Sequence, residues 1–148
     1  MTKLLSCSEI KELDSKTIEN KEITSLDLMS NAVITVEKWI INNYKKNQKF
    51  SIICGNGNNG ADGILLSCKL MLRNYKIKAY YISEVGSPEF NHQFNYARKI
   101  ELNLEEIDFD NLKSIEFSGL IIDCIFGVGL NREIKGKYLK LINFVNSL

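Results

Sequence analysis

The sequence contains only one histidine and one proline among its 148 residues. The single histidine, His92, argues against a Ser-His-Asp triad, and its polar segment is unrelated to any candidate cysteine nucleophile. No two cysteines form a C-x-x-C pair, so neither a zinc finger nor a thioredoxin-like centre is indicated. The four cysteines are Cys7, Cys54, Cys68 and Cys124. Two of them, at positions 54 and 124, lie in apolar runs, where reduced and buried thiols are expected.

The chain also lacks a strong net charge and long apolar runs. A net charge of +1 gives no general electrostatic reason to bind nucleic acid or a membrane surface. The one dense basic cluster, at positions 45, 46 and 49, is typical of a solvated turn. No stretch is long and apolar enough for a signal peptide or a bilayer span, so a cytoplasmic protein without a membrane partner is expected.

What the sequence does contain is an ordinary globular composition arranged as alternating helices and strands. Its apolar fraction of 45% and charged fraction of 25% are those of one soluble domain with a core. Such alternation predicts an α/β layered fold with a parallel sheet. The expected strands are Phe50–Cys54, Lys78–Ile82, Asn103–Ile107 and Gly119–Ile125. The expected helices begin at Ser8, at a cap formed by Thr24 or Ser25, near Ile64, at Ser87-Pro88 and at Gly136, with a helical turn over Asp110–Ser114.

A glycine-rich stretch after the first expected strand organises the chain. Four glycines, at positions 55, 57, 60 and 63, allow a sharp turn and close approach to a ligand. A helix that starts there can hold an anion such as phosphate at its N-terminus. Asn58, Asn59 and Asp62 lie inside this stretch, and an ordinary phosphate cradle does not require them.

The pattern Gly55-x-Gly57-x-x-Gly60 also invites a dinucleotide-fold interpretation, in which Glu84 would hold a ribose. Asp62 opposes it, because a carboxylate beside a pyrophosphate is repelled unless a cation lies between them. Oxygen atoms of Asn59 and Asp123 could bind such a cation. The structural alternative is that both asparagines only satisfy turn backbone and that Asp62 caps the helix.

A second glycine loop follows the last expected strand. Since ligands collect beyond the carboxyl ends of parallel strands, neighbouring strands would bring both loops to one crevice. The residues assembled there would be Asn58, Asn59, Asp62, Asp123 and Arg132. Asp123 must be hydrogen-bonded, paired or bound to metal if its strand is buried, and a purely structural role is equally open. Arg132 suits phosphate but is also a common exposed loop residue, and Lys137 and Tyr138 are expected on a helix surface.

Four motifs in order now carry a family resemblance over nearly the whole chain. They are Glu9-Ile-Lys-Glu-Leu-Asp14, Leu28-Met-Ser-Asn-Ala32, Cys54-Gly-Asn-Gly-Asn-Asn-Gly-Ala-Asp-Gly63 and Asp123-Cys-Ile-Phe-Gly-Val-Gly-Leu130. Together they resemble the YjeF N-terminal domain family, the NAD(P)H-hydrate epimerases. The resemblance implies a Rossmann-like three-layer α/β/α sandwich with two N-terminal helices. It also implies interconversion of the R and S epimers of hydrated NADH or NADPH, an ADP- or ATP-dependent dehydratase as pathway partner, a bound potassium ion and a homodimer.

The resemblance assigns residues by motif. The hydrate-binding residues would be Asn58, Asn59, Gly60, Ala61 and Asp62. A second substrate loop, near the phosphates, would be Gly127, Val128, Gly129, Leu130, Asn131, Arg132 and Glu133. Asn59 and Asp123 would be potassium ligands. No catalytic residue is assigned, and Asp62 and Asp123 are the candidates for a proton shuttle.

The sequence departs from the family pattern in a few places. Ser30 and Val33 replace the usual Glu and Gly of the second helix, and Ala61 replaces a usual Gly. An Asp-x-Pro-Ser-Gly segment, which in the family adds an acidic substrate-binding residue and a further potassium ligand, is absent because Pro88 is the only proline. Residues 1–148 are therefore expected to form a single, C-terminally shortened domain of this type.

Three functions remain open at this point. The epimerase is favoured by Asn59 and Asp123. A binding or scaffold module of the same family is favoured by the absent segment. An ordinary NAD(P)-dependent oxidoreductase, with its ribose held by Glu84, is the third.

Overall fold

The computed structural model describes residues 4–82 and 86–148, and its centre is a parallel sheet. Within these residues four strands pair in the order β3-β2-β1-β4. Their bounds are Lys49–Cys54 for β1, Lys76–Tyr81 for β2, Leu104–Glu106 for β3 and Leu120–Cys124 for β4. Every pairing is parallel, and the register places Cys54 beside Tyr81 on one side and beside Cys124 on the other. The predicted α/β class is confirmed.

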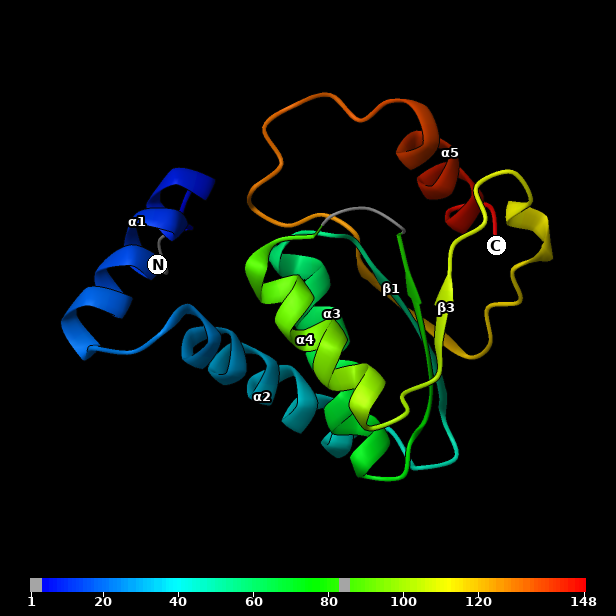
Figure 1. Ribbon diagram of the computed structural model, residues 1–148, viewed down its shortest axis with the longest axis horizontal. Coiled ribbons are helices and arrows are strands. Elements are labelled where there is room, and N and C mark those ends of the chain that lie inside the picture. The colour runs from blue at the N-terminus through cyan, green and yellow to red at the C-terminus, as the bar shows by residue number, and fades with distance from the viewer. Residues whose placement is uncertain (1–3, 83–85) are drawn as a thin grey trace.

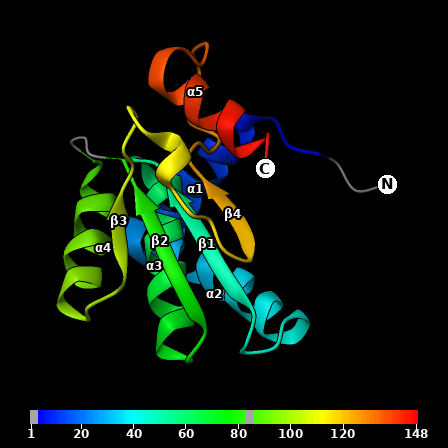
Figure 2. The ribbon, with the colours of Figure 1, turned by 90° about the vertical axis from the view of Figure 1, so that its right-hand side faces the viewer.

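Helices cover the sheet on both faces, so the fold has three layers (Figures 1 and 2). Their bounds are Cys7–Lys21 for α1, Ser25–Asn43 for α2, Asn58–Leu72 for α3, Pro88–Lys99 for α4 and Gly136–Val145 for α5, with a 3-10 turn over Leu112–Ser114. Strand β1 alternates between the two cores: Phe50, Ile52 and Cys54 pack with α2, α3 and α4, whereas Ile53 packs with Leu141 of α5. This alternation is the period of two that a strand imposes on its side chains.

Local capping explains where several helices begin. Thr24 and Asp27 form a capping box at α2, so Thr24 is the N-cap and Ser25, the other predicted candidate, is the first residue of the helix. Ser87 caps α4, with Pro88 at the start of the helix. Ser6 and Glu9 form a second capping box at α1. These caps satisfy backbone N–H groups that have no partner inside the helix.

Helix α3 begins earlier than the sequence pattern predicts. It starts at Asn58 rather than near Ile64, so Asn58 to Asp62 lie in its first turns and not in a loop. Its N-cap is Gly57, and no side chain caps the helix. The alternative in which Asp62 serves as a cap is therefore wrong. Glycine has a low helix propensity, so the sequence pattern predicted a loop over this glycine-rich segment and not a helix.

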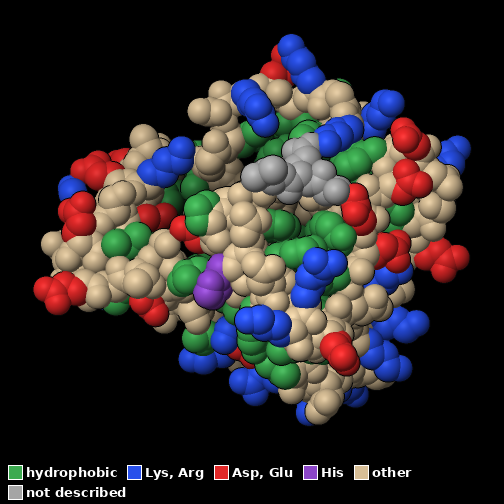
Figure 3. All heavy atoms as spheres, viewed as in Figure 1, with side chains coloured by type: hydrophobic (Ala, Val, Ile, Leu, Met, Phe, Trp, Pro, Cys, Tyr) green, Lys and Arg blue, Asp and Glu red, His purple; other side chains and the backbone are tan. Residues whose placement is uncertain are grey.

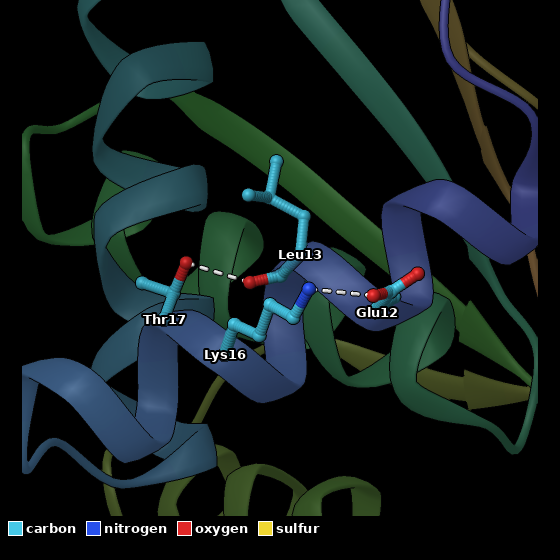
Figure 4. Close-up of polar contacts among 4 residues, drawn as sticks. All are labelled: Glu12, Leu13, Lys16 and Thr17. Carbon is cyan, nitrogen blue, oxygen red and sulfur yellow. Dashed lines mark hydrogen bonds and ion pairs between the residues drawn. The ribbon is translucent and has the colours of Figure 1, made fainter.

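Helix α1 lies apart from the sheet and beside α2 (Figure 1), and no residue of α1 is buried. Its contacts in Figure 4 lie within the helix itself: Lys16 pairs with Glu12 at 2.6 Å, and the Thr17 hydroxyl donates to the Leu13 carbonyl. Such local contacts add little to the stability of a helix of this length. None of the helices over residues 4–82 and 86–148 is long and apolar enough to cross a membrane.

Candidate functional site

The carboxyl ends of β1 and β4 lie side by side and bring two loops together. The strands are neighbours in the sheet, and the Gly55 N–H donates to the Cys124 carbonyl at 3.0 Å. The glycine-rich segment leaves β1 at this point and the second loop leaves β4. The structure therefore places both segments together beyond the ends of two neighbouring strands, as the sequence predicts.

Two glycines permit a very close approach of backbones under this site. A Cβ at Gly60 would overlap the carbonyl group of Gly55. A Cβ at Gly55 would overlap the carbonyl oxygen of Ile125, the first residue after β4. Any larger residue would therefore push the start of α3 away from β4. Gly57 differs, because open space surrounds it.

Asn59 connects the two loops directly. Its Nδ2 donates to the Phe126 carbonyl at 2.9 Å, in a part-buried hydrogen bond between residues 67 positions apart. A Cβ on Gly127 would lie 3.1 Å from the Asn59 Cβ, so this glycine also fits closely. Because Nδ2 is engaged, the amide is held in one orientation, and its Oδ1 remains an acceptor.

Asp123 differs from the expectation in one respect. The strand that carries it is an edge of the described sheet, and Asp123 is exposed rather than buried. Its Oδ1 accepts a hydrogen bond from the Ile125 N–H at 2.8 Å, which fixes the carboxylate at the strand end. The second carboxylate oxygen, Oδ2, remains available to bind another group. The apolar run of β4 indicated burial, but that run cannot reveal that, among the residues the structure describes, no strand pairs with the other side of β4.

Asp62 is a half-buried carboxylate on the first turns of α3. Burial raises its pKa from 3.8 to about 6. Burial also raises the pKa of Cys124 to about 12, and the charges of Asp123 and Asp62 add to that effect. Both carboxylates therefore act on one buried thiol beneath the site, and the structure brings them into the same region. The thiols at 54 and 124 are free and buried, as expected, and Cys68 is also free and buried.

The second loop and α5 enclose a cavity of about 290 Å³. Leu130, Arg132 and Glu133 line it, as members of the predicted substrate loop. Four residues outside the predicted set complete the lining: Phe126, Ile134, Lys135 and Tyr138. Tyr138 lies 5.2 Å from Phe126 between ring centroids, so it packs into this wall and does not lie on an open helix surface. The remaining loop residues, Gly127 to Gly129 and Asn131, are exposed.

The donor set suits a cation that prefers oxygen. The Asn59 Oδ1 and the Asp123 Oδ2 are hard ligands that the hydrogen bonds described above leave available. No group of three or more His, Cys, Asp or Glu among residues 4–82 and 86–148 could hold a metal, so these residues offer no zinc-type centre. Potassium, which carbonyl-type oxygens bind, is compatible with these residues. Glu84, the ribose ligand of the oxidoreductase alternative, lies outside the described residues.

Comparisons with known families and proteins agree on one group. Residues 25–148 match the family described as YjeF-related protein N-terminus. The chain is 30% identical to an NAD(P)H-hydrate epimerase of Limosilactobacillus reuteri, over 98% of this chain and 68% of that protein. It is 31% identical to an NAD(P)H-hydrate epimerase of Lentilactobacillus buchneri, over 99% of this chain and 68% of that protein.

Two further similarities set the extent of the match. A bifunctional NAD(P)H-hydrate repair enzyme of Dictyoglomus turgidum is 31% identical over 99% of this chain, which spans only 29% of that enzyme. The crystal structure of the yeast protein ynu0 superposes with a TM-score of 0.80 over 99% of this chain and 65% of the yeast chain. At 19% sequence identity, this superposition shows a shared fold.

Proposed function

This chain belongs to the YjeF N-terminal family, and from that premise we propose that it is an NAD(P)H-hydrate epimerase. Its substrate would be hydrated NADH or NADPH, and its reaction the interconversion of the R and S epimers at the hydrated ring carbon. The similar proteins of Limosilactobacillus reuteri and Lentilactobacillus buchneri are named NAD(P)H-hydrate epimerases, and these names support the activity. The bifunctional relative supports a dehydratase as the partner that consumes one epimer.

The observation that carries the proposal is the hydrogen bond from Asn59 to Phe126. It joins the glycine-rich segment to the second loop and fixes an amide oxygen at the point where the two meet. Asp62 on one side and Asp123 on the other supply carboxylates to the same region. A polar, partly buried site of this kind can orient a hydrated nicotinamide ring and exclude part of the solvent.

The reaction itself requires little from the protein. The hydrated carbon carries a hydroxyl group next to the ring nitrogen, whose lone pair can expel it. Protonation of that hydroxyl lets it leave as water and gives an iminium cation. Water then adds to either face and returns the proton, so the two epimers exchange. A carboxyl group that titrates near neutral pH is suited to both proton transfers, and Asp62, with a pKa of about 6, has this property.

We further propose that Asn59 and Asp123 hold a potassium ion. When bound, such an ion would lower the repulsion between the carboxylates and the phosphates of the substrate. The chain's own residues would still position the ring and move the proton. Replacing Asp123 by Asn removes a charged ligand and should weaken the dependence of activity on potassium.

The test of the proposed function is the rate of epimer exchange. One epimer of hydrated NADPH is purified and mixed with the protein in potassium buffer, and the two epimers are followed by chromatography. We expect equilibration faster than in buffer alone, and a large loss in Asn59→Asp, which replaces the donor of the hydrogen bond by a second acceptor. Exchange at the rate of buffer alone would reject the activity.

A further inference from the structure

The cavity between the second loop and α5 is lined by charged side chains that have no part in the reaction proposed at Asp62. One wall is aromatic and apolar, with Phe126 and Tyr138 tilted against each other and Leu130 and Ile134 beside them. Another wall is charged, with Arg132 and Lys135 beside the carboxylate of Glu133. Aromatic and apolar groups accept a base or a ribose, and a pair of cations accepts phosphate.

Arg132 is available to an incoming anion. Over residues 4–82 and 86–148 it makes no hydrogen bond and no ion pair. Its guanidinium has five donors in a planar fork that matches a phosphate group. An exposed arginine beside a cavity, without a protein partner, differs from the arginines that hold a fold together, such as Arg73, which binds the buried Glu37.

Lys135 forms an ion pair that an incoming anion can replace. Its Nζ lies 2.8 Å from a carboxylate oxygen of Glu133, and both side chains are about three-quarters exposed, at 73% and 75%. Such an exposed pair contributes little stability. A doubly charged phosphate would therefore compete well with Glu133 for this ammonium group.

The position of the cavity relates it to the site at Asn59. The carbonyl of Phe126 accepts the Asn59 hydrogen bond, while the Phe126 ring lines the cavity. The cavity thus starts where the hydrate site ends, with the backbone of the second loop beside it. Figure 3 shows Lys and Arg side chains gathered along the upper edge of the molecule, over the segment that leads into α5.

Size limits what the cavity can hold. At about 290 Å³ it is at the lower end of the range for ligand sites, so it suits one part of a dinucleotide. If the hydrated ring lies at Asn59 and Asp62, the pyrophosphate would follow along the second loop. The part that would reach the cavity is then the adenosine end, with its ribose.

We propose that this cavity seats the adenosine ribose and its 2′-phosphate, that Arg132 and Lys135 bind this phosphate, and that NADPH hydrate is therefore the preferred substrate. The inference rests on the proposed epimerase function. It assigns a selective role to Lys135, which lies outside the second substrate loop predicted from the sequence. A pyrophosphate-binding role is the alternative, and it differs in its consequence because both hydrates carry a pyrophosphate.

The experiment compares kcat/KM for NADPH hydrate and NADH hydrate in the wild type and in Lys135→Gln. Loss of one charged hydrogen bond to phosphate at an exposed site should lower kcat/KM for NADPH hydrate about tenfold. The value for NADH hydrate should stay unchanged. Lys140→Gln is the matched control, since Lys140 is exposed on α5 and does not line the cavity. Equal losses on both substrates, or no loss, would overturn the proposal.

A binding measurement separates this proposal from the epimerase activity. Adenosine 2′,5′-bisphosphate and adenosine 5′-monophosphate are titrated into the same proteins by calorimetry. We expect tighter binding of the bisphosphate by the wild type and loss of that difference in Lys135→Gln. This result would support the cavity even if neither hydrate were turned over. Equal binding of both nucleotides by the wild type would reject it.

Discussion

At the scale of the residue, Asp62 is a carboxyl group whose ionisation depends strongly on the fold. Its burial on α3 makes the charged form costly, which is why its pKa rises from 3.8 to about 6. Between these two pH values the folded chain keeps a proton that the unfolded chain has lost. The free energy of unfolding should therefore fall as the pH rises from about 4 to about 6, and stay level above that range.

Replacing Asp62 by Asn tests this coupling. The variant should lack the fall between pH 4 and 6, and it should unfold at a higher urea concentration than the wild type at neutral pH. The gain should be smaller than the full pKa difference would give, because water screens the half-exposed carboxylate. Urea unfolding across this pH range measures it, with the exposed Asp110→Asn as control. A wild-type stability that rises between pH 4 and 6, with an equal rise in Asp62→Asn, would contradict the assignment.

Individual site residues were predicted from the sequence to different degrees. Asn59 and Asp62 stood out because a plain phosphate loop does not require their side chains, and Asp123 because a carboxylate on a strand expected to be buried needs a partner. Lys135 and Tyr138 were missed or assigned to a surface, since a basic and aromatic pair at the start of a helix is common on exposed faces. Only the path of the second loop over α5 makes them part of one cavity.

At the scale of the element, the contact of α3 with the strand ends decides whether the two loops meet. Gly60→Ala should force the first turn of α3 away from the Gly55 carbonyl. We expect a loss of about 1–3 kcal/mol in the free energy of unfolding, as for other overpacked sites. Substrate binding should weaken together with it.

Gly57→Ala is the matched control for this element. Gly57 lies three residues earlier, and a Cβ there meets open space. The cost at this N-cap should stay below about 1 kcal/mol. Urea unfolding of both variants measures the difference. Equal losses would mean that backbone freedom, and not the close approach to Gly55, determines the effect.

Element boundaries show which physical signals the sequence carries. The cap at Ser87 was predicted, as was Thr24 as one of two candidates for α2, because the side-chain chemistry of a cap is local. The start of α3 at Asn58 was not, because tertiary packing of Gly60 against Gly55 overrides a weak helix propensity. A pattern that depends on contacts between distant segments cannot be read from one segment alone.

At the scale of the whole molecule, α1 has less support from the rest of the fold than any other described helix of similar length. No residue of α1 is buried, and Leu13 is 53% exposed. A helix with an uncovered apolar side needs a partner surface for lasting stability. We propose that a second copy of the chain provides it, as a symmetric dimer.

Light scattering after size-exclusion chromatography tests the dimer. We expect a mass twice that of one chain for the wild type and a monomer for Leu13→Glu, because a buried unpaired carboxylate opposes association. Leu72→Glu is a control of similar exposure on α3, where Leu72 is 60% exposed. A monomeric wild type, or a Leu13→Glu variant that stays dimeric, would reject this interface.

The order of strands is a property of the whole molecule, and the sequence predicted only part of it. Alternating helices and apolar runs indicated a parallel α/β sheet, and the structure confirms this class. The apolar run of β4 suggested a buried strand, yet within the described residues β4 lies at the edge of the sheet and Leu120 is exposed. The hydrophobicity of a strand predicts the average burial of its side chains, but it does not show which other strands pair with it.

The most direct test of the site's chemistry is epimer exchange in water enriched in oxygen-18. A purified epimer of hydrated NADPH is incubated with the protein, and the product epimers are separated and weighed by mass spectrometry. We expect exchange faster than in buffer, with one heavy oxygen in each inverted molecule, because the original hydroxyl leaves and water replaces it. Inversion without the label would contradict this chemistry, and exchange no faster than in buffer would contradict the activity itself.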